Sequence, residues 1–361
     1  APIGQGHAMT VLRGRDIVTV AASAGGLEPL RTLLEALPAD LHASVLVVLH
    51  IPATGGRTLP RILDRAGVLP AAAAVDGEPL RPGRIYVAPP DLHLLVADGL
   101  VRTSRGPRQN GVRPSADPLF RSAALYGGPR TIGVVLSGTL DDGALGAAAV
   151  EQRGGYVIVQ DPDDAAYDSM PRCALATTRQ PAIRPAGKIA ELLTRLTREE
   201  VVVPADEPPA DLEAEIRGLL AGDPQITPVP RDYSGFTCPE CGGPLYHARE
   251  HAADNYDCLV GHRWSPESLL EEQTSTVERA MWLAIRSLDE RSRLTERLAE
   301  SARSRGHPIS AAHFRAASQE AALAADVIRG ATSKMTPVTE EPVADQITAD
   351  QITADQTGTG R

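Results

Sequence analysis

Three short segments, far apart in the chain, each place a residue type that nucleophilic catalysis requires after an apolar run. Ser23 and His50 each come directly after such a run, and the pair Asp141-Asp142 stands shortly after a third. A serine hydroxyl becomes a nucleophile when a neutral imidazole takes its proton, and a buried carboxylate fixes the tautomer of that imidazole. These residue types, if they meet in space, predict a hydrolase.

The residues after Ser23 suit the same chemistry. Gly25 and Gly26 let the backbone turn sharply from a strand to a helix, and N–H groups at the start of that helix can stabilise an oxyanion. We therefore expect Ala24, Gly25 and Gly26 to lie against the reacting group. The chain order Ser, His, Asp and the missing G-x-S-x-G turn indicate a scaffold other than the α/β-hydrolase fold.

Apolar strands alternate with helical patterns through the first two hundred residues. The predicted strands cover residues 16–22, 43–49, 84–88, 131–136 and 156–159, and residues 92–104 form a local hairpin. This alternation predicts an α/β fold with a doubly wound, mostly parallel sheet. The carboxyl ends of parallel strands line one crevice, so Ser23, His50 and the aspartate pair are expected to converge there.

Changes in composition divide the chain further. We expect an amino-terminal tail at 1–15, the α/β domain at 16–203, a linker rich in proline and acidic residues at 204–234, a small metal module at 235–264, an α-helical hairpin at 265–330 and a disordered tail at 331–361. The linker holds one short helical pattern near 211–220, and the hairpin is interrupted near Gly306-His307-Pro308.

Cysteine and histidine spacing in the small module predicts a metal site. Cys238 and Cys241 form a Cys-x2-Cys pair, and Cys258 with His262 forms a Cys-x3-His pair. Four such ligands complete a tetrahedral site for one structural Zn²⁺. The alternative is that these cysteines are ordinary reduced thiols that bind no metal. His247 or His251 could replace His262, although the Cys-x3-His spacing is tidier. Because a linker precedes the module, we expect metal removal to unfold the module and spare the α/β domain.

Charge and composition limit the classes of function. The chain has 36 basic and 46 acidic residues, a net charge of −10, which argues against a nucleic-acid partner. No apolar run approaches the roughly 18 residues of a membrane span, so we expect no direct membrane insertion. Residues 1–8 have no apolar core of a secretion signal, and the four cysteines do not suggest a secreted disulfide framework. We expect a cytoplasmic protein.

Several motifs occur together, and in a fixed order, between about residues 16 and 196. They are Ala22-Ser23-Ala24-Gly25-Gly26, His50-Ile51-Pro52, Tyr86-Val87-Ala88-Pro89-Pro90 with His93-Leu94, Gly106-Pro107 with Asn110, Arg113-Pro114-Ser115-Ala116-Asp117, and Leu136-Ser137-Gly138 through Asp142-Gly143. In these motifs the chain resembles the catalytic domain of the bacterial chemotaxis protein-glutamate methylesterase family. The resemblance implies that Ser23 is the nucleophile, His50 the general base and Asp142 the orienting acid. It also implies hydrolysis of γ-glutamyl methyl esters on methylated chemoreceptor-like proteins, deamidation of certain glutamines, and no cofactor for catalysis.

Two residues of the site depart from the family pattern, and both bear on substrate fit. Ala24 stands where the family usually has threonine, and Thr139 where it usually has methionine. We expect Thr139 and Arg113 to belong to the substrate-binding surface, with a surface salt bridge as the alternative for Arg113. Asp141 is expected to be solvated or to cap a helix. The first catalytic strand begins near residue 16 without a preceding receiver domain, so we expect no control by phosphorylation of such a domain in cis.

Other functions remain open from the sequence. One is a related serine esterase or amidase with another substrate. Another is a non-catalytic scaffold that binds methylated receptor helices. Three roles remain open for the carboxyl-terminal helices. They could pack only on each other, associate with a second copy of the chain or bind a regulatory partner.

Overall fold

The computed structural model describes residues 11–50, 58–203, 208–222, 232–250 and 253–334. Two compact units make up the chain, Ala1–Leu269 and Leu270–Arg361. Several expectations lie outside the described residues: the structure of residues 1–10, the disorder of residues 335–361, the Ile51-Pro52 part of the histidine motif, and His251 as a ligand.

A parallel sheet of seven strands forms the centre of the first unit, which confirms the predicted α/β class. Across the sheet the strands are β10 (Ala182–Arg184), β9 (Tyr156–Gln160), β8 (Thr131–Val135), β2 (Ile17–Ala22), β3 (Ser44–Leu49), β5 (Ile85–Val87) and β4 (Ala71–Ala73). Strands β2 and β3 are buried along their whole length, as their unbroken apolar runs require of strands covered on both faces.

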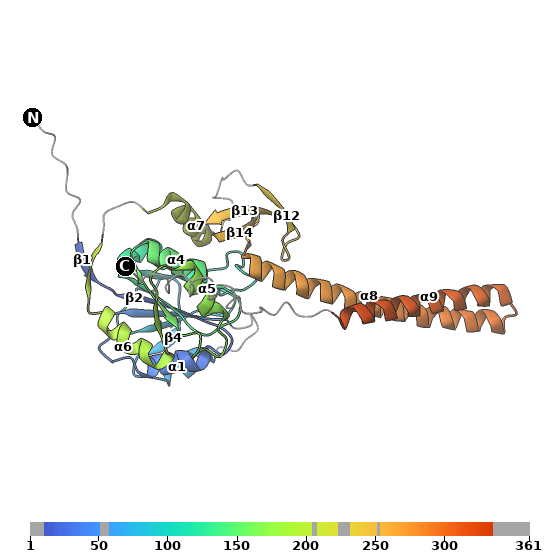
Figure 1. Ribbon diagram of the computed structural model, residues 1–361, viewed down its shortest axis with the longest axis horizontal. Coiled ribbons are helices and arrows are strands. Elements are labelled where there is room, and N and C mark those ends of the chain that lie inside the picture. The colour runs from blue at the N-terminus through green and yellow to red at the C-terminus, as the bar shows by residue number, and fades with distance from the viewer. Residues whose placement is uncertain (1–10, 51–57, 204–207, 223–231, 251–252, 335–361) are drawn as a thin grey trace, which may run out of the picture. The chain divides into compact units, whose positions relative to one another are not determined.

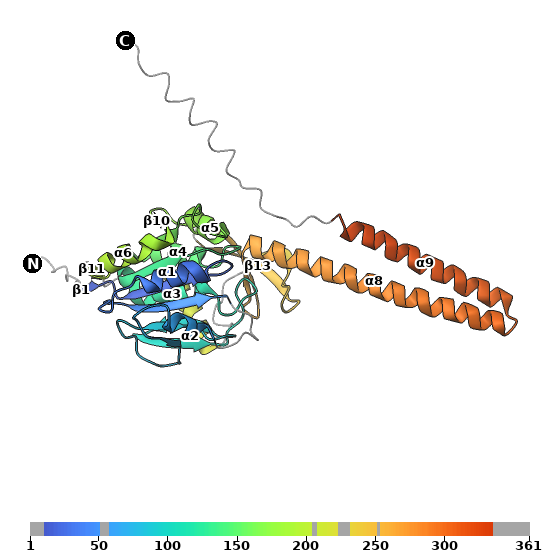
Figure 2. The same cartoon turned by 90° about the horizontal axis from the view of Figure 1, so that it is seen from below.

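Helices cover both faces of this sheet (Figures 1 and 2). One face carries α1 (Leu27–Glu35) and α6 (Ala186–Leu196), and the other carries α3 (Ala116–Gly127), α4 (Ala144–Gln152) and α5 (Ser169–Thr177). Helix α1 shows how the sequence directs this packing, because its leucines at helical spacing, Leu30, Leu33 and Leu34, are its buried residues. The short α2 (Leu59–Asp64) and a 3₁₀ turn at Gly128–Arg130 complete the layers.

The strand order creates a crevice at the carboxyl ends of the central strands. The chain starts in the middle with β2, adds β3 and β5 on one side, and later adds β8, β9 and β10 on the other. Strand β2 therefore has parallel neighbours that lead away in opposite directions, which is the topological switch point where α/β sheets bind ligands.

Two antiparallel strand pairs, each a sheet of its own, and one further helix accompany the seven-stranded sheet. The predicted hairpin forms from β6 (His93–Ala97) and β7 (Leu100–Ser104), and β1 (Val11–Gly14) pairs with β11 (Glu200–Val203). Part of the expected amino-terminal tail is thus a strand. Helix α7 (Ala210–Ala221) is the helical pattern of the expected linker, and its Ile216 and Leu219 are buried beside Leu95.

The cysteine module is a four-stranded antiparallel sheet. Its strands, in order, are β12 (Tyr233–Thr237), β13 (Pro244–Glu250), β14 (Ala253–Cys258) and β15 (Arg263–Trp264). Leu245, Trp264 and Leu269 are buried in its small core. The module belongs to the same compact unit as the parallel sheet, and the Asn110 N–H donates to the Arg263 carbonyl at 2.8 Å. The two parts are in direct contact, which the sequence did not predict.

The second unit is a helical hairpin, as predicted. It consists of α8 (Pro266–Ser304) from Leu270 onward and α9 (Pro308–Thr332), joined at Gly306, whose φ of +76° needs glycine. The Ser292 and Ser318 hydroxyls are 3.1 Å apart, and Arg329 donates to Asp289 at 2.7 Å. No helix among the described residues is both long enough and apolar enough to cross a membrane.

Candidate active site

Ser23, His50 and Asp142 meet at the crevice. Ser23 directly follows β2 and His50 directly follows β3, and the two strands are parallel neighbours. His50 Nδ1 lies 3.0 Å from Ser23 Oγ, and His50 Nε2 lies 2.6 Å from Asp142 Oδ2. In this orientation the imidazole must carry its proton on Nε2, so that Nδ1 is free to accept the serine proton.

Backbone and hydroxyl donors hold the Asp142 carboxylate at the start of α3. Ser115 Oγ donates to Oδ1 at 2.6 Å, and the Ala116 N–H donates to Oδ2 at 2.6 Å. Burial by itself would raise the pKa of Asp142, but the hydrogen bonds from His50, Ser115 and Ala116 outweigh it and lower the pKa below its usual value. The carboxylate is therefore ionised and able to accept from the imidazole. Sequence reasoning missed Ser115, although it belongs to one of the motifs.

A second buried carboxyl mirrors this arrangement. Asp117 of α3 accepts hydrogen bonds from the Gly143 and Gly146 N–H groups, at 3.1 and 2.7 Å, at the start of α4. The start of α3 thus receives Asp142 from the loop before α4, and the start of α4 receives Asp117 from the first turn of α3, which fixes α3 against the acid loop. Burial and the neighbouring Asp142 charge raise the pKa of Asp117 to about 8.

Tight backbone contacts seat the candidate nucleophile. The Ser23 N–H donates to the Ser137 carbonyl at 3.0 Å, and Ser137 Oγ donates to the Ala24 carbonyl at 2.9 Å. At Gly138 an added Cβ would lie 2.0 Å from Met170 Sδ and 2.8 Å from Ser23 Cβ, so only glycine fits there. Gly25 has a φ of +66°, which also favours glycine. These contacts explain the glycines of both motifs by close approach.

The remaining expected site residues lie around this turn. Gly25 and Thr139 are exposed, Ala24 is half-buried and Gly26 is buried. Arg113 forms an ion pair with Asp91, with Nη2 and Oδ1 2.6 Å apart, and donates to the Gly106 carbonyl at 2.8 Å. The structure thus shows the salt bridge that was the alternative for Arg113. A role in substrate binding stays a prediction for all five residues: Ala24, Gly25, Gly26, Arg113 and Thr139.

Asp141 does not have the solvated position expected for it. Its side chain is buried, and Ser265 Oγ and Ser268 Oγ both donate to its Oδ1 at 2.9 Å. The alternative role, a cap of the following helix, does not hold either, because α4 has no side-chain cap hydrogen bond. Both expectations failed because nothing in the local sequence reveals donors that arrive from more than a hundred residues away.

His93 is a buried, neutral histidine beside the site. Its Nε2 donates to the Pro107 carbonyl at 2.9 Å, and its Nδ1 accepts from the Ser115 N–H at 3.3 Å. Burial lowers the pKa of His93 to about 4. The hydrogen bond that Nδ1 accepts requires the neutral ring, and through the two bonds His93 fixes the segment that brings Ser115 to Asp142.

This depressed pKa predicts a pH dependence of stability. Between about pH 4 and pH 6.5 the unfolded histidine binds a proton that the folded one does not, so His93 costs stability as the pH falls through this window. The loss approaches about 3 kcal/mol at the acid end. We expect His93→Gln, which keeps a donor and an acceptor but does not titrate, to show a flatter dependence in denaturant unfolding.

The comparison must be made between the two proteins rather than on the wild type alone. Burial also raises the pKa of Asp141 to about 6, and this carboxyl changes stability in the opposite direction over the same range. Identical slopes of unfolding free energy against pH in the wild type and His93→Gln would contradict a neutral, buried His93.

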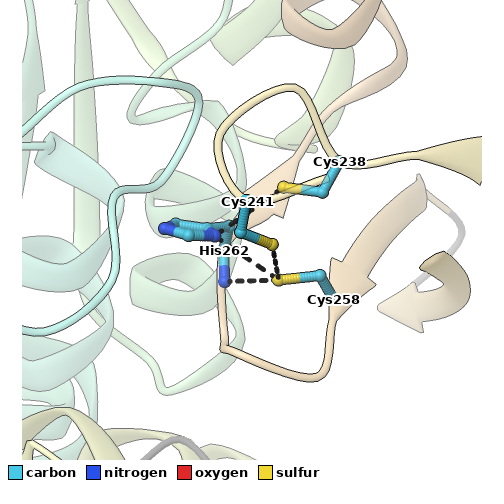
Figure 3. A group of neighbouring side chains, drawn as sticks. All are labelled: Cys238, Cys241, Cys258 and His262. Atoms are coloured by element: carbon cyan, nitrogen blue, oxygen red, sulfur yellow. Dashed lines mark hydrogen bonds between the residues drawn. The ribbon is translucent and has the colours of Figure 1, made fainter. Parts of the chain in front are cut away.

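The predicted metal ligands lie together in the small module (Figure 3). Ligand atoms of Cys238, Cys241, Cys258 and His262 all lie within 4.8 Å of one another. Cys241 Sγ and Cys258 Sγ are 3.7 Å apart, and Cys258 Sγ is 3.5 Å from His262 Nδ1. A tetrahedral Zn²⁺ centre requires about 3.8 Å between two sulfurs and about 3.5 Å between sulfur and nitrogen. The four residues therefore fit a metal ion of this kind. His247, the alternative to His262, is exposed on β13 and does not belong to the cluster.

The fold and the site define the class of protein: an α/β protein with a serine, a histidine and an aspartate at the switch point of a parallel sheet. The family model of the CheB methylesterase matches residues 18–193. A protein of Leptospira interrogans, provisionally named for protein-glutamate methylesterase and protein-glutamine glutaminase activities, is 35% identical over 187 residues, which are 52% of this chain and 97% of that protein. The chain belongs to the CheB methylesterase family.

Further relatives match over the same part of the chain. A protein-glutamate methylesterase/protein-glutamine glutaminase of Anaeromyxobacter dehalogenans is 44% identical over 51% of this chain and 54% of its own length. One from Symbiobacterium thermophilum is 36% identical over 51% of each chain, so this chain spans about half the length of several curated relatives. The crystal structure of the Thermotoga maritima CheB methylesterase catalytic domain matches 50% of this chain and 98% of that one, with 33% identity and a TM-score of 0.47.

Proposed function

We propose that this protein is a protein-glutamate methylesterase that hydrolyses γ-glutamyl methyl esters on chemoreceptor-like proteins and deamidates glutamine at such sites. The observation that carries the proposal is the position of His50, with one ring nitrogen 3.0 Å from Ser23 Oγ and the other 2.6 Å from Asp142. Membership of the CheB methylesterase family supports the choice of ester and of substrate.

The reaction takes two steps. His50 Nδ1 removes the proton from Ser23 Oγ as this oxygen attacks the ester carbonyl carbon, and Asp142 stabilises the imidazolium. The imidazolium then gives its proton to the departing methoxide, which leaves as methanol. Water, activated in the same way, attacks the acyl-serine, releasing the glutamate carboxylate and restoring Ser23. With glutamine the leaving group is ammonia.

We propose that the metal centre is structural and holds one Zn²⁺. Three cysteines and one histidine would fill all four tetrahedral positions, so none remains for a reacting water. A cytoplasmic location suits these thiols and the expected substrate.

The experiment that tests the proposed function is methanol release from methylated receptor preparations. We expect the full chain to release methanol from methylated receptors and none from unmethylated ones, with Ser23→Ala as the inactive control. Turnover of a small methyl ester without turnover of receptors would favour the related esterase with another substrate. Binding of receptors with no turnover of either ester would favour the scaffold.

A further inference from the structure

Two serines at the start of α8 hold the carboxylate next to Asp142. Ser265 Oγ and Ser268 Oγ each donate to Asp141 Oδ1 at 2.9 Å, and all three residues are buried. The Ser268 N–H donates to Ser265 Oγ at 3.0 Å, so Ser265 also caps the helix. In the cap the Ser265 oxygen accepts a hydrogen bond. The hydroxyl protons that Ser265 and Ser268 donate to Asp141 form separate hydrogen bonds that capping does not require.

The loop that carries Asp141 needs such an anchor. It leads from β8 to α4, and Leu140, directly before Asp141, has a φ of +61°, a left-handed conformation that is unfavourable for a residue with a side chain. A buried carboxylate without donors would be a further cost. Burial is the main cause that raises the pKa of Asp141 to about 6, and the two serine hydroxyls act against it by stabilising the ionised form.

The same helix start is fastened to the segment on the other side of Asp142. The Ser265 N–H donates to Asn110 Oδ1 at 2.9 Å, and the Asn110 N–H donates to the Arg263 carbonyl at 2.8 Å. A Cβ at Gly111 would lie 3.2 Å from the Trp264 ring. This segment continues to Ser115, which donates to Asp142. Residues 263–268 thus contact both segments between which Asp142 is held.

We infer that Ser265 and Ser268 are positioning residues of the proposed esterase site, which hold the acid loop in register through Asp141. The inference rests on the proposed role of Asp142 as the triad acid. It makes the metal module part of the support of the site, because His262 lies directly before β15, which leads into the helix start, and the Cys258 N–H donates to the His262 carbonyl at 3.0 Å.

The sharpest test is Ser268→Ala in the full chain. Alanine suits the first turn of a helix, and the variant leaves the Ser265 cap in place, so the fold should be preserved. We expect kcat toward a small methyl ester, per active site titrated with a fluorophosphonate, to fall about tenfold, because a slightly displaced acid misorients His50. KM should stay near the wild-type value, and Ser268→Thr, which keeps the hydroxyl, should recover most of the loss. Ser304→Ala, at an exposed serine of the same helix, is the matched control.

Hydrogen exchange separates this inference from the proposed function. Amides of residues 138–143 should exchange faster in Ser268→Ala than in the wild type, whether or not the wild type hydrolyses an ester. A wild type without esterase activity would refute the proposed function, and faster exchange would still support the anchor. Unchanged kcat in an active enzyme, or unchanged exchange in an inactive one, would overturn the inference.

Discussion

Ser23→Ala and His50→Ala should each abolish ester hydrolysis while the protein stays folded. Either change removes the proton transfer between Oγ and Nδ1 that the 3.0 Å contact permits. Alanine at position 23 keeps the Cβ that lies against Gly138, so the packing of the turn is retained. Turnover of a small methyl ester, thermal unfolding and labelling by a fluorophosphonate should be measured together.

Asp142→Asn should lower kcat by a factor of about 10⁴. A loss of this size is found when the acid of a comparable triad becomes an amide and the imidazole takes the wrong tautomer. Ser115 and the Ala116 amide would still contact the side chain, so this loss should not come from unfolding. Full activity in Ser23→Ala would end the serine mechanism. Labelling that persists in that variant would place the nucleophile at another residue.

Loss of the metal should have the second large effect. Purified protein should contain about one Zn²⁺ per chain, and Cys258→Ser or chelation should remove it and unfold the module, because zinc supplies about 10 kcal/mol or more to such small folds. Trp264 is buried in the module core and Trp282 is exposed on α8, so the unfolding should shift tryptophan emission to longer wavelength. Cys173→Ser is the matched control, since Cys173 is not in the cluster.

The contacts of the module also change the expectation for activity. The sequence predicts that chelation spares the α/β domain, whereas the hydrogen bonds that Ser265 donates to Asn110 and Asp141 predict that esterase activity falls with the metal. Protein purified without chelator that contains no metal would contradict the zinc centre. Full activity after metal loss would show that the acid loop keeps its geometry without the module.

Local patterns in the sequence predicted the central fold and predicted that the three candidate catalytic residues converge at one crevice. Strands such as β2 and β3 are long apolar runs, so their burial and type follow directly from composition. The metal ligands were equally easy to predict, because two short cysteine and histidine spacings specify a tetrahedral site.

Elements that depend on distant partners were missed. Strand β4 is three alanines, which have low strand propensity, and it forms only because β5 lies beside it. Helix α5 contains Pro171 near its start and little apolar periodicity, and its Met170 instead fills the space over Gly138. The anchor on Asp141 could not be predicted for the same reason, since Ser265 and Ser268 look like an ordinary helix start in the sequence.

The antiparallel pair of β1 and β11 has a consequence for how this α/β domain can be joined to other segments. Val11 lies opposite Val203 and Gly14 opposite Glu200, so the chain enters and leaves the domain at neighbouring points. A domain with adjacent ends can be inserted into, or joined to, other polypeptides without stretching its own fold. The stretch from β1 to β11 is thus closed at its own ends, and the chain that continues beyond β11 returns through Ser265 and Ser268 to hold the loop of Asp141.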